Sequence, residues 1–365
     1  MSRVNSTLVA AEAAVATETE ILARPQLACS LCGTPGNVLH SGLIDRQSSS
    51  PGVWSIRRCD DPQCGLMWLD PLPLEQELYK AYESYYTHAG RRSDKGVMAR
   101  VMGAMKRGCL ANCFGYRKGV SPLVRLAGWF PWLYPGRPPE LDLSVMWLDA
   151  SRKGTLLDIG AGSGWLVEHM NSLGWDAQGL DFDPVAVRNA RARGLKFHQG
   201  SIFNQGFPEA TFNAVTLCHS IEHFPDPVAV VRECLRIVRP GGQVVMATPN
   251  TDSLGHRIFG GSWFPLDSPR HLHLFNRQSM ASMIARAGAD QFRIFSTFRD
   301  ANGVFVASRA IRRYGRFDVN VSRSALIKIA GRVAQMVEIL AMVIDPWWGE
   351  DLVAIIENSG TTRRP

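Results

Sequence analysis

A glycine-rich turn at residues 155–164 constrains the fold of this 365-residue chain more than any other feature of its sequence. The apolar run 155–159 has the length and composition of a buried strand, and it leads into glycines at alternate positions, Gly160, Gly162 and Gly164. Glycine is favoured where φ is positive or where a ligand approaches the backbone closely. A helix that begins at Gly164 presents its free N–H groups to such a ligand. The pattern therefore predicts a strand–turn–helix unit built around a bound ligand.

Strands and helices alternate through the residues that follow this turn. A strand, helix or insertion is expected at each of these ranges: strands at 155–159, 175–180, 195–198, 214–218, 243–247, 291–298 and 352–357; helices at 164–173, 184–193, 227–238 and 279–287; a mostly helical insertion at 303–350. Such alternation implies a parallel sheet with helices on both faces. We therefore predict an α/β fold with a Rossmann-like doubly wound sheet.

The spacing of the glycines and a nearby acidic residue limit the class of ligand that the turn can bind. A dinucleotide fingerprint requires a third glycine at position 165, where Trp165 stands, so the turn suits a ligand without a pyrophosphate and disfavours an oxidoreductase. Asp181 ends the second strand and can accept hydrogen bonds from both hydroxyls of a ribose. The alternative role, capping the next helix, fits Asp183 better because Pro184 follows it at the first helical position.

At this point the chain resembles a known family, the class I S-adenosylmethionine-dependent methyltransferases. Residues 158–164 are similar to motif I of that family, residues 179–181 to its ribose-binding acid, and residues 239–242 to the turn before its fifth strand. The resemblance covers about residues 154–300 and implies the class I sheet with an antiparallel last strand. The chain departs from the family at Ser201, where many members have an acid, and at Asn213, where Asp is common.

The resemblance also implies the cofactor, S-adenosylmethionine, and the residues that hold it. Asp158 would fix the amino group, Gly160 and Gly162 would line the methionine half, and Asp181 would hold the ribose. Ser201 or Ile202 would meet the adenine. The other cofactor contacts expected on this basis are Ala161, Gly164, Phe182 and His219.

Two pairs of cysteines near the N-terminus indicate a metal site. Cys29 and Cys32 form a C-x₂-C knuckle, and Cys59 and Cys64 form a C-x₄-C knuckle; each knuckle is followed by a glycine. Four such thiolates can hold a tetrahedral zinc with no open position, which predicts a structural zinc. Of the four other cysteines, Cys109 and Cys113 are expected to be small apolar residues without a ligand role, and Cys218 and Cys234 are expected to lie in the core.

The sequence divides into five segments on this interpretation. They are a disordered tail at 1–25, a zinc-ribbon module at 26–72, a helical linker and basic lid segment at 73–150, a methyltransferase core at 151–302, and a helical insertion with the last core strand at 303–365. Residues 64–73 with the tyrosines at 85 and 86 resemble a zinc-ribbon leader that precedes some bacterial methyltransferase domains. Residues 1–24 have no secretory pattern and no apolar run reaches membrane-spanning length, which predicts a cytoplasmic protein.

The fourth strand ends in a group of titratable residues. Glu222-His223 and Asp226-Pro227 resemble the E-H-x-x-D-P stretch of many small-molecule methyltransferases, including ubiquinone-pathway O-methyltransferases. Methyl transfer to a hydroxyl requires in-line alignment and a base, and histidine suits that base near neutral pH. We expect His223, steered by Glu222, to be the base, with His271 second; the structural alternative, a buried histidine that binds backbone groups, is favoured for His219 and His273.

The basic residues of the chain are concentrated in one segment. Between Arg91 and Glu140 there are ten basic and two acidic residues, an excess large enough to account for the net charge of +7. That segment is either a solvated face or a site for a nucleotide-sugar, glycan or lipid-linked acceptor, or for peripheral membrane contact. Arg270 either pairs an acidic substrate group or forms a salt bridge within the fold. An RNA-base methyltransferase and a non-catalytic cofactor-binding scaffold are the alternatives; the chain lacks a base-gripping motif and a platform for single strands, so a nucleic-acid partner is not expected.

Overall fold

A seven-stranded sheet forms the centre of the computed structural model, which describes residues 20–82, 96–130, 137–317 and 325–360. Its strand order is β12-β13-β10-β9-β6-β7-β8. The strands are β6 (Thr155–Ile159), β7 (Asp176–Asp181), β8 (Phe197–Gln199), β9 (Phe212–Cys218), β10 (Val238–Pro249), β12 (Phe292–Thr297) and β13 (Asp351–Glu357). Strands β6 to β10 pair in parallel, whereas β13 is antiparallel to both β10 and β12. The predicted Rossmann-like sheet with an antiparallel last strand is confirmed.

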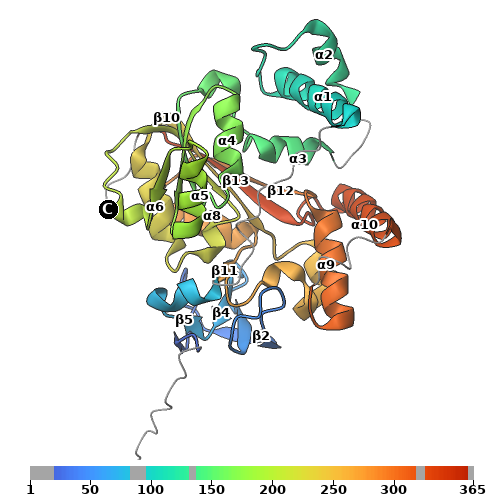
Figure 1. Ribbon diagram of the computed structural model, residues 1–365. Helices are drawn as coiled ribbons and strands as arrows, with labels where there is room; N and C mark the ends of the chain where they lie inside the picture. Colours follow the sequence, from blue (N-terminus) through green and yellow to red (C-terminus); the bar gives the residue numbers. More distant parts are fainter. Residues whose placement is uncertain (1–19, 83–95, 131–136, 318–324, 361–365) are drawn as a thin grey trace, which may run out of the picture.

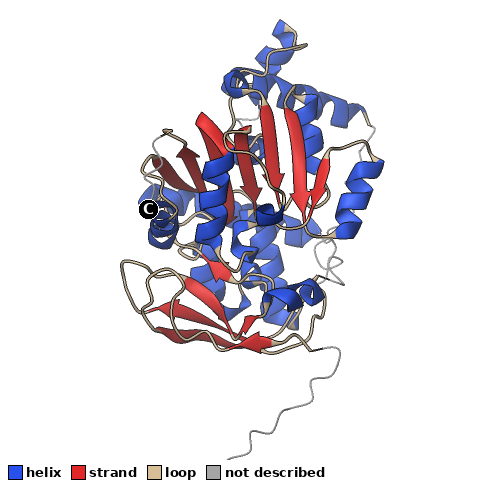
Figure 2. Ribbon diagram, turned by 90° about the vertical axis from the view of Figure 1, so that its left-hand side faces the viewer, coloured by secondary structure: helices blue, strands red, loops and turns tan. Residues whose placement is uncertain are grey.

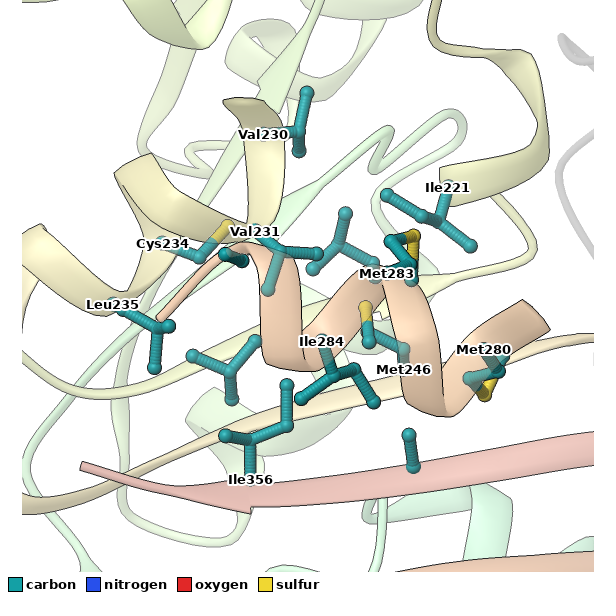
Figure 3. Packing of buried hydrophobic residues seen from close by; sticks show 14 of the residues in the cluster. Ile221, Val230, Val231, Cys234, Leu235, Met246, Met280, Met283, Ile284 and Ile356 are labelled. Atoms are coloured by element: carbon teal, nitrogen blue, oxygen red, sulfur yellow. The ribbon is translucent and has the colours of Figure 1, made fainter. Parts of the chain in front are cut away.

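Helices cover both faces of this sheet (Figure 1). They include α4 (Trp165–Ser172) and α5 (Pro184–Ala192) on one face, and α6 (Pro227–Ile237) and α8 (Arg277–Arg286) on the other. Figure 3 shows Met246 of β10 and Ile356 of β13 among side chains of α6 and α8, such as Val231 and Met283. The expected helices and strands therefore exist, with ends that differ by a few residues because apolar periodicity locates an element better than its caps do.

A smaller antiparallel sheet lies beside the carboxyl edge of the large one (Figure 2). It contains β2 (Gly36–Leu43), β3 (Trp54–Cys59), β4 (Met67–Asp70) and β11 (His273–Leu274) in the order β11-β4-β3-β2. Strand β11 comes from the end of the expected core segment, and it covers an edge of β4 whose backbone groups would otherwise lack partners. The fully buried Leu66 and Trp68 belong to the same apolar cluster as the face of the large sheet. Residues 26–72 thus fold onto the core and share strands with it.

The end of the expected tail is ordered. Residues 1–19 lie outside the described part of the chain, but β1 (Ala23–Arg24) pairs with β5 (Leu72–Pro73). The expectation of disorder up to residue 25 is therefore wrong for its last residues. A strand of two residues is too short to show an alternation of apolar and polar side chains, so neither β1 nor β5 was predicted from the sequence.

The basic segment is helical where it is described. It contains the 3₁₀ helix η1 (Glu75–Ala81) and the helices α1 (Val97–Cys113), α2 (Pro122–Ala127) and α3 (Arg137–Ser144), while 83–95 and 131–136 lie outside the described residues. The chain after α1 is anchored by Tyr116, whose hydroxyl donates to the Leu148 carbonyl and accepts from Trp175 Nε1. Trp175 directly precedes β7. Ala150, whose N–H donates a hydrogen bond to the Phe114 carbonyl, lies shortly before β6. This end of α1 therefore lies at the amino ends of the strands, opposite the glycine turn, and does not serve as a lid over it.

The short 3₁₀ helix η3 (Ala150–Arg152) precedes β6 at the amino ends of the strands. The remaining elements lie at the carboxyl edge and in the C-terminal insertion. They are η4 (Ile202–Asn204), η5 (Ile221–His223), α7 (Leu254–Phe259), η6 (Gly260–Ser262), η7 (Phe264–Leu266), α9 (Ala301–Tyr314) and α10 (Ala325–Ile344). Helices α9 and α10 connect β12 to β13 and pack against each other (Figure 1). Across the described ranges, no helix has both the length and the apolar character required to span a bilayer.

Candidate functional site

The glycine turn between β6 and α4 has the conformation that its sequence requires. Gly160, Gly162 and Gly164 all have positive φ, at 72°, 49° and 74°. A Cβ on Gly160 would lie 2.6 Å from the Ser220 Cβ, whereas a Cβ on Gly162 would meet no heavy atom within 4 Å. Packing therefore excludes a side chain at Gly160, while the backbone at Gly162 faces open space that a ligand can occupy.

Two buried carboxyl groups flank this turn. Asp181 accepts the Gly162 N–H through Oδ2 at 2.7 Å and the Asp183 N–H through Oδ1 at 2.9 Å. Asp158 accepts the Thr216 hydroxyl at 2.8 Å. Burial raises the pKa of Asp181 and raises that of Asp158 to about 7, because desolvation disfavours the charged forms. A ligand that brings a cation and hydroxyl donors would stabilise both carboxylates. Asp183 caps α5 through Val185 N–H, as expected.

The other residues expected to contact the cofactor lie around the same edge with different surroundings. Ala161 is buried in the turn and Phe182, which is 48% exposed, packs edge-on against Tyr82 with ring centroids 5.0 Å apart. The Ser201 hydroxyl accepts a hydrogen bond from the Phe203 N–H and so caps the N-terminus of η4. The Ile202 side chain, in contrast, is buried in the apolar cluster under the sheet. Of the pair proposed for the adenine, Ser201 is the one whose side chain is not committed to the core.

Glu222 is a completely buried carboxylate surrounded by imidazoles. It lies in η5, directly after β9, and its Oε2 accepts the Thr248 hydroxyl at 2.9 Å. Its Oε1 accepts no hydrogen bond, although His219 Nδ1 lies 3.7 Å away and His271 Nε2 lies 3.9 Å away. Burial alone would raise the pKa of Glu222, but the histidines lower it to about 2. The carboxylate is therefore ionised at neutral pH and has one oxygen available for a cation or a proton donor.

His223 and His271 meet next to this carboxylate, with ring centroids 4.8 Å apart. His271 Nδ1 donates to the Pro265 carbonyl at 2.7 Å, and burial lowers its pKa to about 4, so Nε2 carries a lone pair at neutral pH. His223 Nδ1 lies 3.0 Å from the Arg270 carbonyl and 3.0 Å from the Tyr82 hydroxyl. A proton on Nδ1 that is donated to that carbonyl leaves the Nε2 lone pair of His223 available as well.

The structure thus brings together the three residues expected to carry the chemistry, and it adds one. Ligand atoms of Glu222, His223 and His271 all lie within 4.8 Å of one another, so the group has donors suited to a shared proton or to a divalent metal. Tyr82 was not predicted to belong to this group, because it lies in the segment 73–150 that was expected to be a helical linker and basic lid. Its contact with His223 spans 141 residues of sequence, which no local pattern indicates.

His219, His273 and Arg270 are held by interactions within the fold. His219 has φ of 52° and its Nε2 accepts from Arg299, which also pairs with Asp351 at 3.2 Å. His273 connects the Phe224 carbonyl to Ser30. The Arg270 guanidinium is completely buried and forms ion pairs with Asp45 and Asp267. Of the two roles considered for Arg270, the salt bridge is therefore the one observed.

The four N-terminal cysteines converge at the ends of β2, β3 and β4. Cys29 Sγ lies 3.7 Å from Cys64 Sγ, and Cys32 Sγ lies 3.4 Å from Cys59 Sγ; all four sulfurs lie within 4.8 Å of one another. The Zn–S bond length of about 2.3 Å in a tetrahedron requires sulfurs about 3.8 Å apart. Backbone N–H groups of Leu31 and Leu66 point at the sulfurs of Cys29 and Cys64. The donor set and its spacing therefore fit zinc.

A family model described as a methyltransferase domain matches residues 139–291. Among curated proteins, a ubiquinone biosynthesis O-methyltransferase of Alkalilimnicola ehrlichii is 33% identical over 150 residues, which is 39% of this chain and 61% of that protein. Proteins with the same name from Xanthomonas oryzae pv. oryzae and Pseudomonas paraeruginosa are 34% and 32% identical. They share 39% and 37% of this chain, and 62% and 63% of their own lengths. The chain thus spans about three fifths of the length of these curated relatives.

Solved structures give weaker similarity over more of the chain. Phosphoethanolamine N-methyltransferase 2 of Haemonchus contortus, in complex with S-adenosyl-L-methionine, aligns with a TM-score of 0.44 and 15% identity, covering 80% of this chain and 62% of that one. A possible histamine N-methyltransferase of Thermotoga maritima aligns with a TM-score of 0.41 and 14% identity, covering 67% and 99%.

Proposed function

We propose that the chain is an S-adenosylmethionine-dependent methyltransferase that acts on a small-molecule hydroxyl, a proposal supported by the match of residues 139–291 to a family model described as a methyltransferase domain. The observation that carries this proposal is the glycine turn, where the backbone at Gly162 faces open space between the buried carboxyls Asp158 and Asp181. The names of the curated O-methyltransferases support oxygen as the acceptor atom.

The turn and the strand ends supply the groups that this cofactor needs. Asp158 receives the ammonium group, whose charge offsets the desolvation that raises the carboxyl pKa. Asp181 accepts from the ribose hydroxyls with the lone pairs left by its two backbone contacts. The N–H groups at the start of α4 face the carboxylate end. The remaining contacts in the proposal are Gly160, Ala161, Gly164, Phe182, His219 and, of the pair expected to meet the adenine, Ser201, since the Ile202 side chain is buried in the apolar cluster.

The bound cofactor supplies a methyl group on a sulfonium, ready for direct displacement. His223 Nε2 takes the proton of the acceptor hydroxyl, while its Nδ1–H remains on the Arg270 carbonyl. The ionised Glu222 stabilises the imidazolium that results. His271 is the second candidate for the base, because its Nε2, which carries a lone pair, lies 3.9 Å from Glu222 Oε1. The acceptor is therefore proposed to enter between η5 and the loop that precedes β11.

We further propose a structural zinc on Cys29, Cys32, Cys59 and Cys64. Four thiolates leave no position for a reactant, so this ion would hold the ends of β2 to β4 and take no part in methyl transfer.

The first test is calorimetric titration of the purified full chain with S-adenosylmethionine and, separately, with NADH, with zinc quantified on the same sample. Micromolar binding of the first ligand alone and about one zinc per chain is expected. Asp181→Ala should weaken binding at least tenfold, whereas Asp176→Ala, an exposed acid on the same strand, should not. Folded, zinc-loaded protein that binds no S-adenosylmethionine would refute the proposal.

Methyl transfer is tested separately with a panel of catechol and sugar hydroxyl acceptors. Transfer by the wild-type chain that falls 10²–10⁴-fold in His223→Ala, with cofactor affinity unchanged, is the expected result. Cofactor binding without transfer to any acceptor or protein would favour the non-catalytic scaffold.

A further inference from the structure

Helix α10 has its polarity reversed relative to an ordinary surface helix. Eight large apolar side chains of its 20 residues are exposed. They are Leu326, Ile329, Val333, Met336, Val337, Leu340, Val343 and Ile344. Their spacing of three and four residues places them on one face. The buried face carries Gly331, Gln335 and Glu338 instead. A sequence that buries an amide and a carboxyl while it exposes leucine and valine indicates a face with an apolar partner.

The charges around this face are of one sign. Lys328 and Arg332 are exposed on α10, and the adjacent α9 carries exposed Arg309, Arg312 and Arg313. Neither helix has an acid at an exposed position, since Glu338 is the one acid in either helix and it is buried. No carboxylate in the described ranges forms an ion pair with any of these five basic side chains. A second copy of this surface would therefore add cations and no anions, whereas an anionic surface would complement it.

The apolar surface continues inward beneath α10. A cavity of about 390 Å³ lies between α7, α9 and α10. Ile258, Val333 and Val337 belong both to its lining and to the exposed apolar surface. In Figure 1 the two helices lie at the margin of the molecule. The face is therefore accessible over the roughly 30 Å length that a 20-residue helix spans.

We propose that α10 is a membrane-docking helix: its apolar face enters the interfacial region of an anionic lipid bilayer, and the basic side chains of α9 and α10 bind the lipid phosphates. An interfacial helix needs a large apolar face, a basic flank and no capacity to span, and α10 has these properties. Attraction to the anionic headgroups strengthens with each basic residue and weakens with salt. This surface lies outside residues 139–291, so the proposal does not depend on methyl transfer.

The test is co-sedimentation of the purified full chain with large unilamellar vesicles. One set contains phosphatidylglycerol and phosphatidylcholine in equal parts, and the other contains phosphatidylcholine alone. Binding to the anionic vesicles that weakens at high salt is expected. Leu340→Glu with Val343→Glu should lower the partition coefficient at least tenfold, and Lys328→Glu with Arg332→Glu should lower it on anionic vesicles only. Val53→Glu is the matched control, because Val53 is 67% exposed but lies in the N-terminal sheet region.

Protein fold and oligomeric state are followed for every variant by circular dichroism and light scattering. Leu340 and Val343 are 65% and 82% exposed, so charged residues there should leave the fold intact; a milder pair, Leu340→Gln with Val343→Gln, covers the case in which they do not. Equal sedimentation of wild type and the α10 variants, or no sedimentation of the wild type, would overturn the proposal. A dimer that Leu340→Glu with Val343→Glu dissociates, without vesicle binding by the wild type, would assign the face to a second copy.

Discussion

Asp158 is the residue whose protonation should couple to cofactor binding. Burial raises the pKa of its carboxyl from 3.8 to about 7 in the free protein, so the group is largely protonated below pH 7. Binding of an ammonium group requires the ionised form. We therefore expect affinity for S-adenosylmethionine to increase up to tenfold per pH unit as the pH rises towards 7, and to level off above it.

Calorimetry between pH 5.5 and 8.5 checks this dependence. Asp158→Asn, which keeps the contact with Thr216 but cannot ionise, should bind more weakly and show a flat profile over the same range. A wild-type profile as flat as that of the variant would mean that Asp158 does not receive the ammonium group.

Tyr82 should act as a positioning residue for His223. Its hydroxyl lies 3.0 Å from His223 Nδ1, and its ring packs against Phe182 at the edge of the proposed cofactor site. Removing only the hydroxyl with Tyr82→Phe keeps the ring packing, so we expect kcat to fall about tenfold and the pH profile to shift, with little change in cofactor affinity. Tyr79→Phe, at an exposed position in η1, the 3₁₀ helix that ends at Tyr82, is the control. Equal rates for both variants would remove Tyr82 from the proposed site.

Individual residues differ in how far sequence could identify their roles. Asp181 and Asp183 were distinguished because strand end, cap position and Pro184 all lie within a few residues of one another. The Tyr82–His223 contact and the Arg270–Asp45 ion pair span 141 and 225 residues of sequence, where no local period exists. Local chemistry therefore identified the helix cap at Asp183 and left Asp181 for the proposed ribose contact, whereas the contacts that the N-terminal region makes with the histidines required the fold.

At the scale of elements, the N-terminal sheet should depend on zinc. The strands β2 to β4 carry four clustered sulfurs at their ends, and metal binding in such modules contributes on the order of 10 kcal/mol to folding. Cys59→Ser, or chelation of the wild type, should remove the ion and expose the amides of β3 and β4 to hydrogen exchange. Cys113→Ser changes an exposed cysteine outside the cluster and should keep one zinc per chain. The measurements are zinc content per chain and hydrogen exchange of the β3 and β4 amides. Full zinc occupancy in Cys59→Ser would contradict the assignment.

The elements themselves were predicted unevenly, for a physical reason. The strands and helices of the large sheet were expected at their observed positions because their apolar runs are long enough to show a period. The strands of the two smaller sheets were not predicted individually, and four of them, β1, β5, β11 and β4, have only two to four residues each. Short strands are stabilised by their partners more than by their own sequence, so the pairing of β11 with β4 could not be read from either segment.

At the scale of the whole molecule, the buried guanidinium of Arg270 joins the N-terminal region to the core. It pairs with Asp45 across the two regions and donates to the Ala81 carbonyl, and both charged side chains of the Arg270–Asp45 pair are completely buried. Because ionised groups left without partners in the interior are costly, Arg270→Met should lower the free energy of unfolding by about 3–5 kcal/mol. Lys196→Met breaks the exposed pair with Asp176 and should cost less than about 1 kcal/mol.

The contacts between the N-terminal region and the core also determine how the molecule unfolds. Trp68 from the N-terminal sheet lies in the apolar cluster of the large sheet, and β11 pairs with β4, so neither region can open without exposing the other. Urea unfolding of the zinc-loaded wild type, followed by tryptophan fluorescence and by far-ultraviolet circular dichroism, should therefore give coincident transitions. In Arg270→Met the midpoint should fall while the two probes stay coincident, because Trp68 and the pairing of β11 with β4 still join the two regions. Two separate transitions in the wild type would mean that residues 26–72 form an independent module after all.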